Sequence, residues 1–242
     1  MTHPAHTAPT TVLARRSAAV RVHSPRSHGS RAFGRRPSAP WTPPEGLQPQ
    51  QVQAIIDAAE CERDRLLLRV LWATGARVSE ALELTPGSVR RGALVLPNRK
   101  NPSRTVKVVA LPAHQLDLPG ELLLWAREQG LAVDEPLFPS RKHGPGGQRR
   151  PIGEAQAWRI VRAASERAGV FVLAMRPSRW GERGQPAPAH PHLFRHARVR
   201  QILRATRSLP LAQKQAGWSR LQLAYLTLSD AEAAAMMQEV RE

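Results

Sequence analysis

The chain has 242 residues, enough for one large domain or two small ones, and 41% of them are hydrophobic, which suffices for a core. Its 36 Lys and Arg residues outnumber 19 Asp and Glu, and the net charge of +17 favours a polyanionic partner, with nucleic acid as the leading candidate. An anionic membrane is the weaker candidate, because no apolar run is long enough to span a bilayer. The single cysteine, Cys61, excludes an intrachain disulfide and a cysteine-based zinc site.

The first 45 residues have the composition of a disordered arm. They contain seven arginines and many Ser, Pro and Ala residues, and no acidic residue precedes Glu45. Too little apolar surface is present to offset the entropy cost of ordering such a segment. We interpret residues 1–45 as a basic N-terminal arm that grips phosphates without sequence preference. An organelle transit peptide, which has a similar composition, is the second interpretation, and a start codon assigned too far upstream is the third.

Helical periodicity characterises the segment that follows the arm. Pro49 suits the first turn of a helix, and Gly75 can adopt the left-handed conformation that ends one. A short helix is expected soon after Arg77. The helices expected in this part are residues 49–59, 61–73 and 79–84.

The period then changes from helix to strand. Residues 93–96 and 105–111 are rich in β-branched and apolar side chains, and a polar turn separates them. These runs predict an antiparallel hairpin with Lys100 at or near its tip. A second lysine, Lys107, falls inside the second strand.

The second half of the chain is again mostly helical in pattern. Residues 136–153 are rich in Pro, Gly and basic residues and predict a loop. Residues 171–191 contain four prolines and two glycines, and we expect a solvated surface loop there, with a DNA-contacting loop as the alternative. The helices expected in this half are residues 121–129, 154–168, 192–204, 209–216 and 230–240.

One of these helices carries a basic motif at its start. Read as a helix, the chain puts His192, Arg195, His196 and Val199 on one stripe, at spacings of three, four and seven. The amides at a helix N-terminus attract anions, so a histidine and an arginine one turn apart form a candidate phosphate site. Taken alone, the same residues are better explained as solvated charges on a basic helix, because short motifs recur by chance.

Other stretches supply matching chemistry in a fixed order. The sequence TGARVSE, residues 74–80, lies upstream, and the pair Gly217-Trp218 and then Tyr225 lie downstream. With HLFRH at residues 192–196, this order resembles the tyrosine recombinase (phage integrase) family over roughly residues 47–230. The resemblance implies a mainly α fold with a small antiparallel β-hairpin or sheet, the tyrosine recombinase catalytic domain, here over residues 46–242.

The family breaks a phosphodiester without a metal, and this needs donors on the phosphate, a general acid and a nucleophile. By resemblance, Arg77 and Arg195 are the two catalytic arginines, and guanidinium suits the task because it binds phosphate oxygens in a bidentate manner. The alternatives are a helix-start salt bridge from Arg77 to Glu80 and a non-catalytic DNA contact by Arg195. Lys100 corresponds to the hairpin lysine that protonates the departing 5′ oxygen, and Lys107 is its competitor.

The resemblance also assigns roles to the residues of the later motifs. His192 corresponds to the histidine that assists proton movement, and His196 to a second histidine for which we expect a structural role. Trp218 stands where the family carries His or Trp. Its indole can donate one hydrogen bond to a phosphate oxygen, but it cannot shuttle a proton, and core packing is compatible with this.

Tyr225, the only tyrosine of the chain, is the candidate nucleophile. The family mechanism would leave a 3′-phosphotyrosine and a free 5′-hydroxyl, and rejoining by the reverse step needs no ATP or other cofactor. No acidic cluster with metal-site spacing is evident, which disfavours a two-metal nuclease. Tyr225 lies seven residues after Trp218, whereas about nine is usual in the family. The tyrosine could therefore act in its own site, act in a neighbouring protomer, or be inactive.

A second departure concerns the front of the chain. The helical domain that usually precedes the catalytic domain and helps to clamp DNA is expected to be absent, because the arm is too short for it. The leading hypothesis is a site-specific recombinase that acts on double-stranded DNA. We expect it to work in the cytoplasm on the nucleoid and to form a multimer on DNA. Accessory proteins are possible partners. The alternatives are a non-catalytic DNA-binding protein on the same scaffold and a type IB topoisomerase-like relaxing enzyme.

Overall fold

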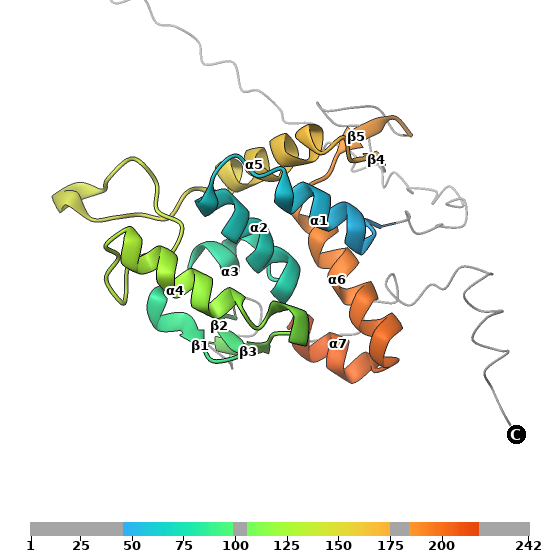
Figure 1. Ribbon diagram of the computed structural model, residues 1–242, viewed down its shortest axis with the longest axis horizontal. Helices are drawn as coiled ribbons and strands as arrows, with labels where there is room; N and C mark the ends of the chain where they lie inside the picture. The colour runs from blue at the N-terminus through green and yellow to red at the C-terminus, as the bar shows by residue number, and fades with distance from the viewer. Residues whose placement is uncertain (1–45, 99–105, 175–183, 218–242) are drawn as a thin grey trace, which may run out of the picture. The chain divides into compact units, whose positions relative to one another are not determined.

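The computed structural model describes residues 46–98, 106–174 and 184–217 (Figure 1). The basic arm, Lys100, Trp218, Tyr225 and the helix expected at residues 230–240 lie outside the described residues. No helix in this described part of the chain is both long and apolar enough to cross a membrane.

Helices make up most of the described chain. They are α1 (Pro49–Asp57), α2 (Glu62–Thr74), α3 (Val78–Leu82), α4 (Leu118–Glu128), α5 (Glu154–Arg167), α6 (Pro191–Thr206) and α7 (Leu209–Ala216), with short 3₁₀ turns at Pro86–Ser88, Ala113–Gln115 and Pro145–Gly147. The helices expected from periodicity within the described residues are confirmed, with shifted ends. α4 starts earlier than expected, since Pro119 is accommodated in its first turn, where its missing N–H is not needed.

Helix α2 is the centre of the core. It packs against α1, α3, α4 and α6, and in Figure 1 it lies between these helices. Its side chains from Leu66 to Leu68 are fully buried, and Phe138 and Phe194 fill the space around it. A smaller cluster, with Val199, Ile202, Ala212 and Ala216 as its buried members, fixes α7 against the C-terminal half of α6.

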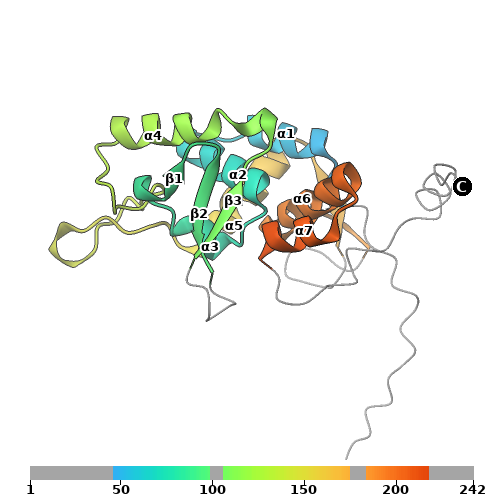
Figure 2. The same cartoon turned by 90° about the horizontal axis from the view of Figure 1, so that it is seen from below.

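The predicted hairpin is confirmed in its strands. β1 (Val89–Arg90), β2 (Ala93–Pro97) and β3 (Val106–Ala110) form an antiparallel sheet in the order β1-β2-β3. In β3, Lys107 and Val109 are buried while the residues on either side are exposed, so Lys107 points to the inner face of the sheet. The side-chain amide of Gln215 on α7 donates to the carbonyl of Ala110 at 3.2 Å, and Figure 2 shows α7 close to β3.

The expected loop at residues 171–191 needs a correction at both ends. Residues Phe171–Leu173 (β4) pair antiparallel with Pro186–Pro188 (β5) in a two-stranded sheet. Prolines are tolerated here because a two-stranded sheet offers edge positions where an N–H donor is not required. The pairing leads the chain directly into α6, whose first residues carry the candidate site.

Candidate active site

Arg77 is held by the turn between α2 and α3. Gly75 ends α2 in the left-handed conformation, at φ 61°, and its N–H donates to the carbonyl of Leu71 at 3.0 Å. Arg77 then caps α3. Its backbone N–H donates to Oε2 of Glu80 at 3.1 Å, and its guanidinium donates to Oε1 at 2.7 Å. The salt bridge considered as an alternative role for Arg77 is therefore present, and it fixes where the guanidinium lies.

The carboxylate of Glu80 also binds a second cation. Its side chain is fully buried, and Nζ of Lys107 lies 2.7 Å from Oε2. Burial by itself would raise the pKa of Glu80, but Lys107 and Arg77 outweigh that effect and lower the pKa below its usual value. The group is therefore an anion between two cations.

Lys107 lies inside the same cluster. Burial lowers the pKa of its amine, Glu80 opposes this, and the nearby positive charges of Arg195 and Arg77 lower it further, with a net decrease. A Cβ placed on Gly217 would lie 3.2 Å from Cδ of Lys107, so the chain after α7 passes directly against this side chain. Among the described residues, Lys107 is the lysine that the fold brings to the two arginines.

Arg195 joins two chain segments that are distant in sequence. It is 4% exposed, and its guanidinium donates to the carbonyl of Gly75 at 2.6 Å and to the carbonyl of Ala216 at 2.5 Å. Both carbonyls stand at helix ends, where the last carbonyls of a helix have no partner within the helix. Arg195 thus ties the end of α2, just before Arg77, to the end of α7, just before Gly217.

His192 stands at the start of α6 with its side chain exposed to solvent. Partial burial of its ring, then the charges of Arg195 and Arg77, lower its pKa, while Glu154 has a smaller opposite effect. Arg195 donates to the carbonyl of Gly75, two residues before Arg77, and Arg77 and Lys107 share the carboxylate of Glu80, so the structure brings these three side chains together. The charges of both arginines also act on His192. This is the convergence that the order of the motifs predicts.

Sequence reasoning named Lys107 only as the competitor of Lys100, and it missed Trp158 and His190. Lys107 is held by Glu80, and Trp158 and His190 lie against His192, with ring centroids 5.8 Å and 6.1 Å from its ring. The alternation of β3 gave no signal for Lys107, because it lies between Val106 and Val108, and alternation alone would place these valines inward and the lysine outward. Nor does any signal link Trp158 to His192, since the contact depends on how α5 packs against α6.

The second histidine of the HLFRH box has a different environment. Burial, aided by neighbouring cations and histidines, lowers the pKa of His196 to about 4, so its ring is neutral at pH 7. A neutral, largely enclosed ring within α6 agrees with the structural role expected of it, which remains a prediction.

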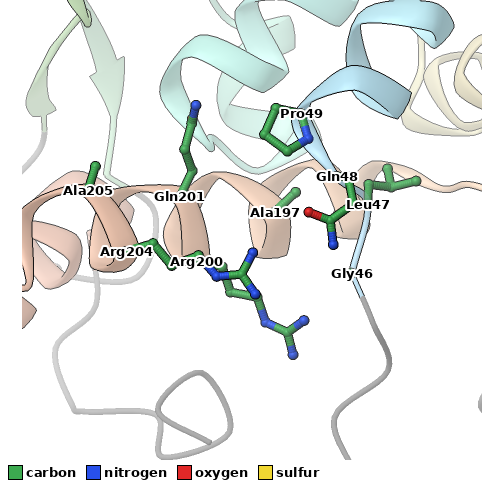
Figure 3. Close-up of a pocket in the computed structure, with 9 residues that line it drawn as sticks. All are labelled: Gly46, Leu47, Gln48, Pro49, Ala197, Arg200, Gln201, Arg204 and Ala205. Carbon is green, nitrogen blue, oxygen red and sulfur yellow. The ribbon is translucent and has the colours of Figure 1, made fainter. Parts of the chain in front are cut away.

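The described residues also form a pocket of about 310 Å³ where the N-terminal end of α1 meets α6 (Figure 3). Arg200 and Arg204, one turn apart on α6, line it together with Gly46, Leu47, Gln48, Pro49, Ala197, Gln201 and Ala205. None of these residues belongs to the candidate site, but the two guanidinium groups add positive charge to the same helix. Within the part of the chain that the structure describes, no three His, Cys, Asp or Glu side chains are grouped as metal ligands.

Comparison with known proteins agrees with this fold and with the order of the motifs. Residues 45–228 match the family model described as "Phage integrase family", so the chain belongs to that family. Among curated proteins it is similar to the tyrosine recombinase XerD of Xanthomonas axonopodis pv. citri, with 27% identity over 197 residues, which is 76% of this chain and 58% of XerD. The chain thus spans little more than half the length of the curated relatives that it matches.

Solved structures agree on the fold. The crystal structure of XerA recombinase matches with a TM-score of 0.62 at 18% identity, over 86% of this chain and 68% of that one. The XerH site-specific recombinase bound to a palindromic difH substrate, in a post-cleavage complex, matches with a TM-score of 0.57 at 20% identity, over 82% and 54%. The mainly α fold with small antiparallel sheets is therefore that of a tyrosine recombinase catalytic domain.

Proposed function

We propose that this protein cleaves and rejoins DNA strands in site-specific recombination, through a covalent link between Tyr225 and a 3′ phosphate. One observation carries the proposal: the guanidinium of Arg195 donates to the carbonyl of Gly75, two residues before Arg77, so two arginines from distant parts of the sequence lie at one place in the fold. Two arginines, a histidine and a lysine without a metal form a site for a phosphate that gains negative charge as it reacts. The family supports site-specific recombination as the general class of activity.

The proposed steps balance without a cofactor. The phenol oxygen of Tyr225 attacks phosphorus, loses its proton to His192 or to water, and forms a new phosphorus–oxygen bond. The bond from phosphorus to the 5′ oxygen breaks, and this oxygen takes a proton from a lysine. The products are a 3′-phosphotyrosine and a free 5′-hydroxyl, and the reverse steps rejoin a strand. The arginines bind the two non-bridging oxygens, for which planar guanidinium is well suited.

The protonation states support these roles. A His192 with a pKa below its usual value is neutral at pH 7 and can accept a proton or a hydrogen bond. The amine of Lys107 forms an ion pair with Glu80 at 2.7 Å, which favours its charged form and opposes the effect of burial on its pKa. Lys100 remains the lysine proposed to protonate the leaving oxygen, and Trp218 the proposed donor to a phosphate oxygen.

Double-stranded DNA is the proposed partner, bound as a multimer in the cytoplasm on the nucleoid. The net charge of +17 supports a polyanion. XerH, the similar protein above, is described as bound to its difH substrate, and a lambda integrase with a TM-score of 0.52 is described as a tetramer bound to a Holliday junction. Accessory proteins are part of the proposal by resemblance only.

The short spacing of seven residues between Trp218 and Tyr225 favours a second candidate, a non-catalytic DNA-binding protein on the same scaffold. The test begins with selection of a preferred duplex from random DNA by the purified protein. That duplex is then made with a nick close to the cleavage site. On cleavage, the short fragment that carries the free 5′-hydroxyl dissociates, so the strand cannot be rejoined and the covalent adduct accumulates. The adduct migrates slowly in a denaturing gel.

We expect an adduct with the wild-type protein and none with Tyr225→Phe. Site-specific binding without an adduct would exclude strand cleavage in favour of the second candidate. An adduct with Tyr225→Phe would refute the nucleophile assignment. Relaxation of supercoiled plasmid without any preferred sequence would identify a topoisomerase-like enzyme instead.

A further inference from the structure

Three aromatic rings meet where α5 contacts the start of α6. Trp158 on α5 stacks on His190, with centroids 5.2 Å apart and planes inclined by 13°. The ring of His192 stands edge-on to both, at 5.8 Å from Trp158 and 6.1 Å from His190, with interplanar angles of 82° and 81°. These are favoured geometries for aromatic pairs. The histidine of the candidate site therefore contacts two rings on one side.

His190 occupies an unusual position for its residue type. It is the N-cap of α6, where Ser, Thr, Asp or Asn would accept a hydrogen bond from a free helix N–H, yet its side chain makes no such bond. Its Nδ1 is buried and has no hydrogen-bond partner among the described residues. Both features cost stability, on the order of 1 kcal/mol for a missing cap. The contacts that its side chain makes are ring contacts rather than a capping bond.

Trp158 provides a fixed platform for these rings. It lies on α5 between residues that anchor the helix in the core: Ala157 and Val161 are fully buried. The helix begins at Glu154, whose carboxylate opposes the lowering of the pKa of His192. The stack joins α5 to the first turn of α6, and this turn contains His192.

We propose that Trp158 and His190 are positioning residues that hold the imidazole of His192 in one orientation at the candidate phosphate site. The inference rests on the proposed function, because it gives that reaction two further residues. The exposed imidazole would otherwise sample several orientations about its χ1 and χ2 bonds. Two rings that meet its edge restrict this choice, and a displacement of about 1 Å in a catalytic group can slow a reaction by roughly a hundredfold.

The charged and titratable groups around His192 come from three elements. His190 and Arg195 lie at its own end of α6, Arg77 comes from the start of α3, and Glu154 from α5. Removal of an aromatic ring exposes the imidazole more fully to water while these charges stay in place. The position of the ring can therefore be followed through the pH at which His192 titrates, without reference to activity.

The first experiment measures single-turnover cleavage of the nicked duplex by the full chain, at protein concentrations that saturate the DNA. We expect Trp158→Leu and His190→Ser to cleave about 10 to 100 times more slowly than wild type with DNA affinity unchanged within about twofold. Trp158→Phe, which keeps an aromatic ring, should recover most of the rate. Trp125→Leu is the matched control, since Trp125 is a partly buried tryptophan of α4 outside this cluster.

His190→Ser separates positioning from ordinary structural support. Serine at the N-cap can form the missing capping bond, so thermal stability should stay the same or rise while cleavage slows. The proposal would be overturned if Trp158→Leu and His190→Ser lost thermal stability and cleavage rate to the same extent as the control Trp125→Leu. Wild-type cleavage rates in both Trp158→Leu and His190→Ser would also overturn it. If Trp158→Leu does not fold, His190→Ser and Trp158→Phe decide the matter alone.

The second experiment follows ¹³C-labelled histidine by NMR in the absence of DNA. His192, assigned from His192→Gln, should titrate below pH 6.5 in wild type and closer to 6.5 in Trp158→Leu and His190→Ser. An unchanged titration in both variants would overturn the ring contact. If even wild type fails to cleave DNA, the proposed function fails, yet this titration still tests whether the two rings hold His192.

Discussion

Lys107 and Arg77 bind opposite oxygens of one buried carboxylate, that of Glu80, each at 2.7 Å. The strand β3 and the start of α3 are thereby fixed to each other at the centre of the candidate site. A buried anion held by two cations leaves a net positive charge, to which Arg195 adds. The arrangement makes Glu80 a support for Arg77 and Lys107 rather than a group that opposes phosphate binding.

The first prediction concerns the roles of the two lysines. Lys107→Met should slow cleavage at least about tenfold and lower the free energy of unfolding by about 1–3 kcal/mol, because Glu80 loses a charged hydrogen-bond partner. Lys100→Met should slow cleavage without a comparable loss of stability. The measurement is single-turnover cleavage together with urea denaturation of both variants.

A substrate with sulfur in place of the 5′ bridging oxygen distinguishes the roles. A thiolate leaves without protonation, so this substrate should restore the rate of Lys100→Met and leave Lys107→Met slow. The reverse pattern, with Lys107→Met restored, would make Lys107 the proton donor. Lys107→Arg serves as the control, since it retains the charge opposite Glu80.

The sequence already contained much of the framework. Apolar periodicity located α1 and α5, because their buried side chains repeat at helical spacing, whereas α2 was located by its nearly continuous apolar run. The order of the motifs predicted that Arg77, His192 and Arg195 would share a site, and the fold brings these three together. These features are local or follow from the family resemblance, so a single chain suffices for them.

What escaped sequence reasoning depends on packing between distant segments. The carbonyl partners of Arg195 are Gly75 and Ala216, and only the tertiary arrangement of α2, α6 and α7 brings them within reach. The strand β5 was hidden by its prolines, which argue against a strand unless an edge position is known.

Arg195 should prove to be both structural and catalytic. Arg195→Ala removes two hydrogen bonds from buried carbonyls at the ends of α2 and α7, and each unsatisfied group costs about 1–3 kcal/mol. The loss of a donor to the reacting phosphate would cost a further roughly 3 kcal/mol of transition-state stabilisation. We therefore expect a lower melting temperature and cleavage reduced more than a hundredfold. Arg195→Lys should recover part of the stability but little of the rate, and cleavage within tenfold of wild type in Arg195→Ala would contradict the catalytic role.

Stability should fall in mild acid because of two histidines. The pKa values of His190 and His196 are lowered to about 4, in both cases mainly by burial. Between pH 6.5 and about 4 the unfolded chain binds protons at these sites and the folded chain does not, so the free energy of unfolding decreases as the pH falls. The slope is at most about 1.4 kcal/mol per pH unit for each histidine. Above pH 6.5 both states are neutral at these sites and the contribution is constant.

Urea denaturation at pH 7.5, 6.0 and 5.0 measures this slope. His190→Ser should make it shallower, since one depressed pKa is removed. His114→Ser is the matched control, because His114 is an exposed histidine in the turn before α4. An equal slope in wild type and His190→Ser would show that His190 does not resist protonation.

The close approach of the chain to Lys107 can be tested with two glycines. Gly217 and Gly130 have similar left-handed conformations, at φ 63° and 59°. A Cβ at Gly217 would lie 3.2 Å from Cδ of Lys107, whereas a Cβ at Gly130 would have no neighbour within 4 Å. Alanine at either position should cost about 1–2 kcal/mol of backbone strain. Only Gly217→Ala should also displace the lysine and slow cleavage, by several fold, and equal cleavage rates in the two variants would indicate that the position of Lys107 is not critical for the reaction.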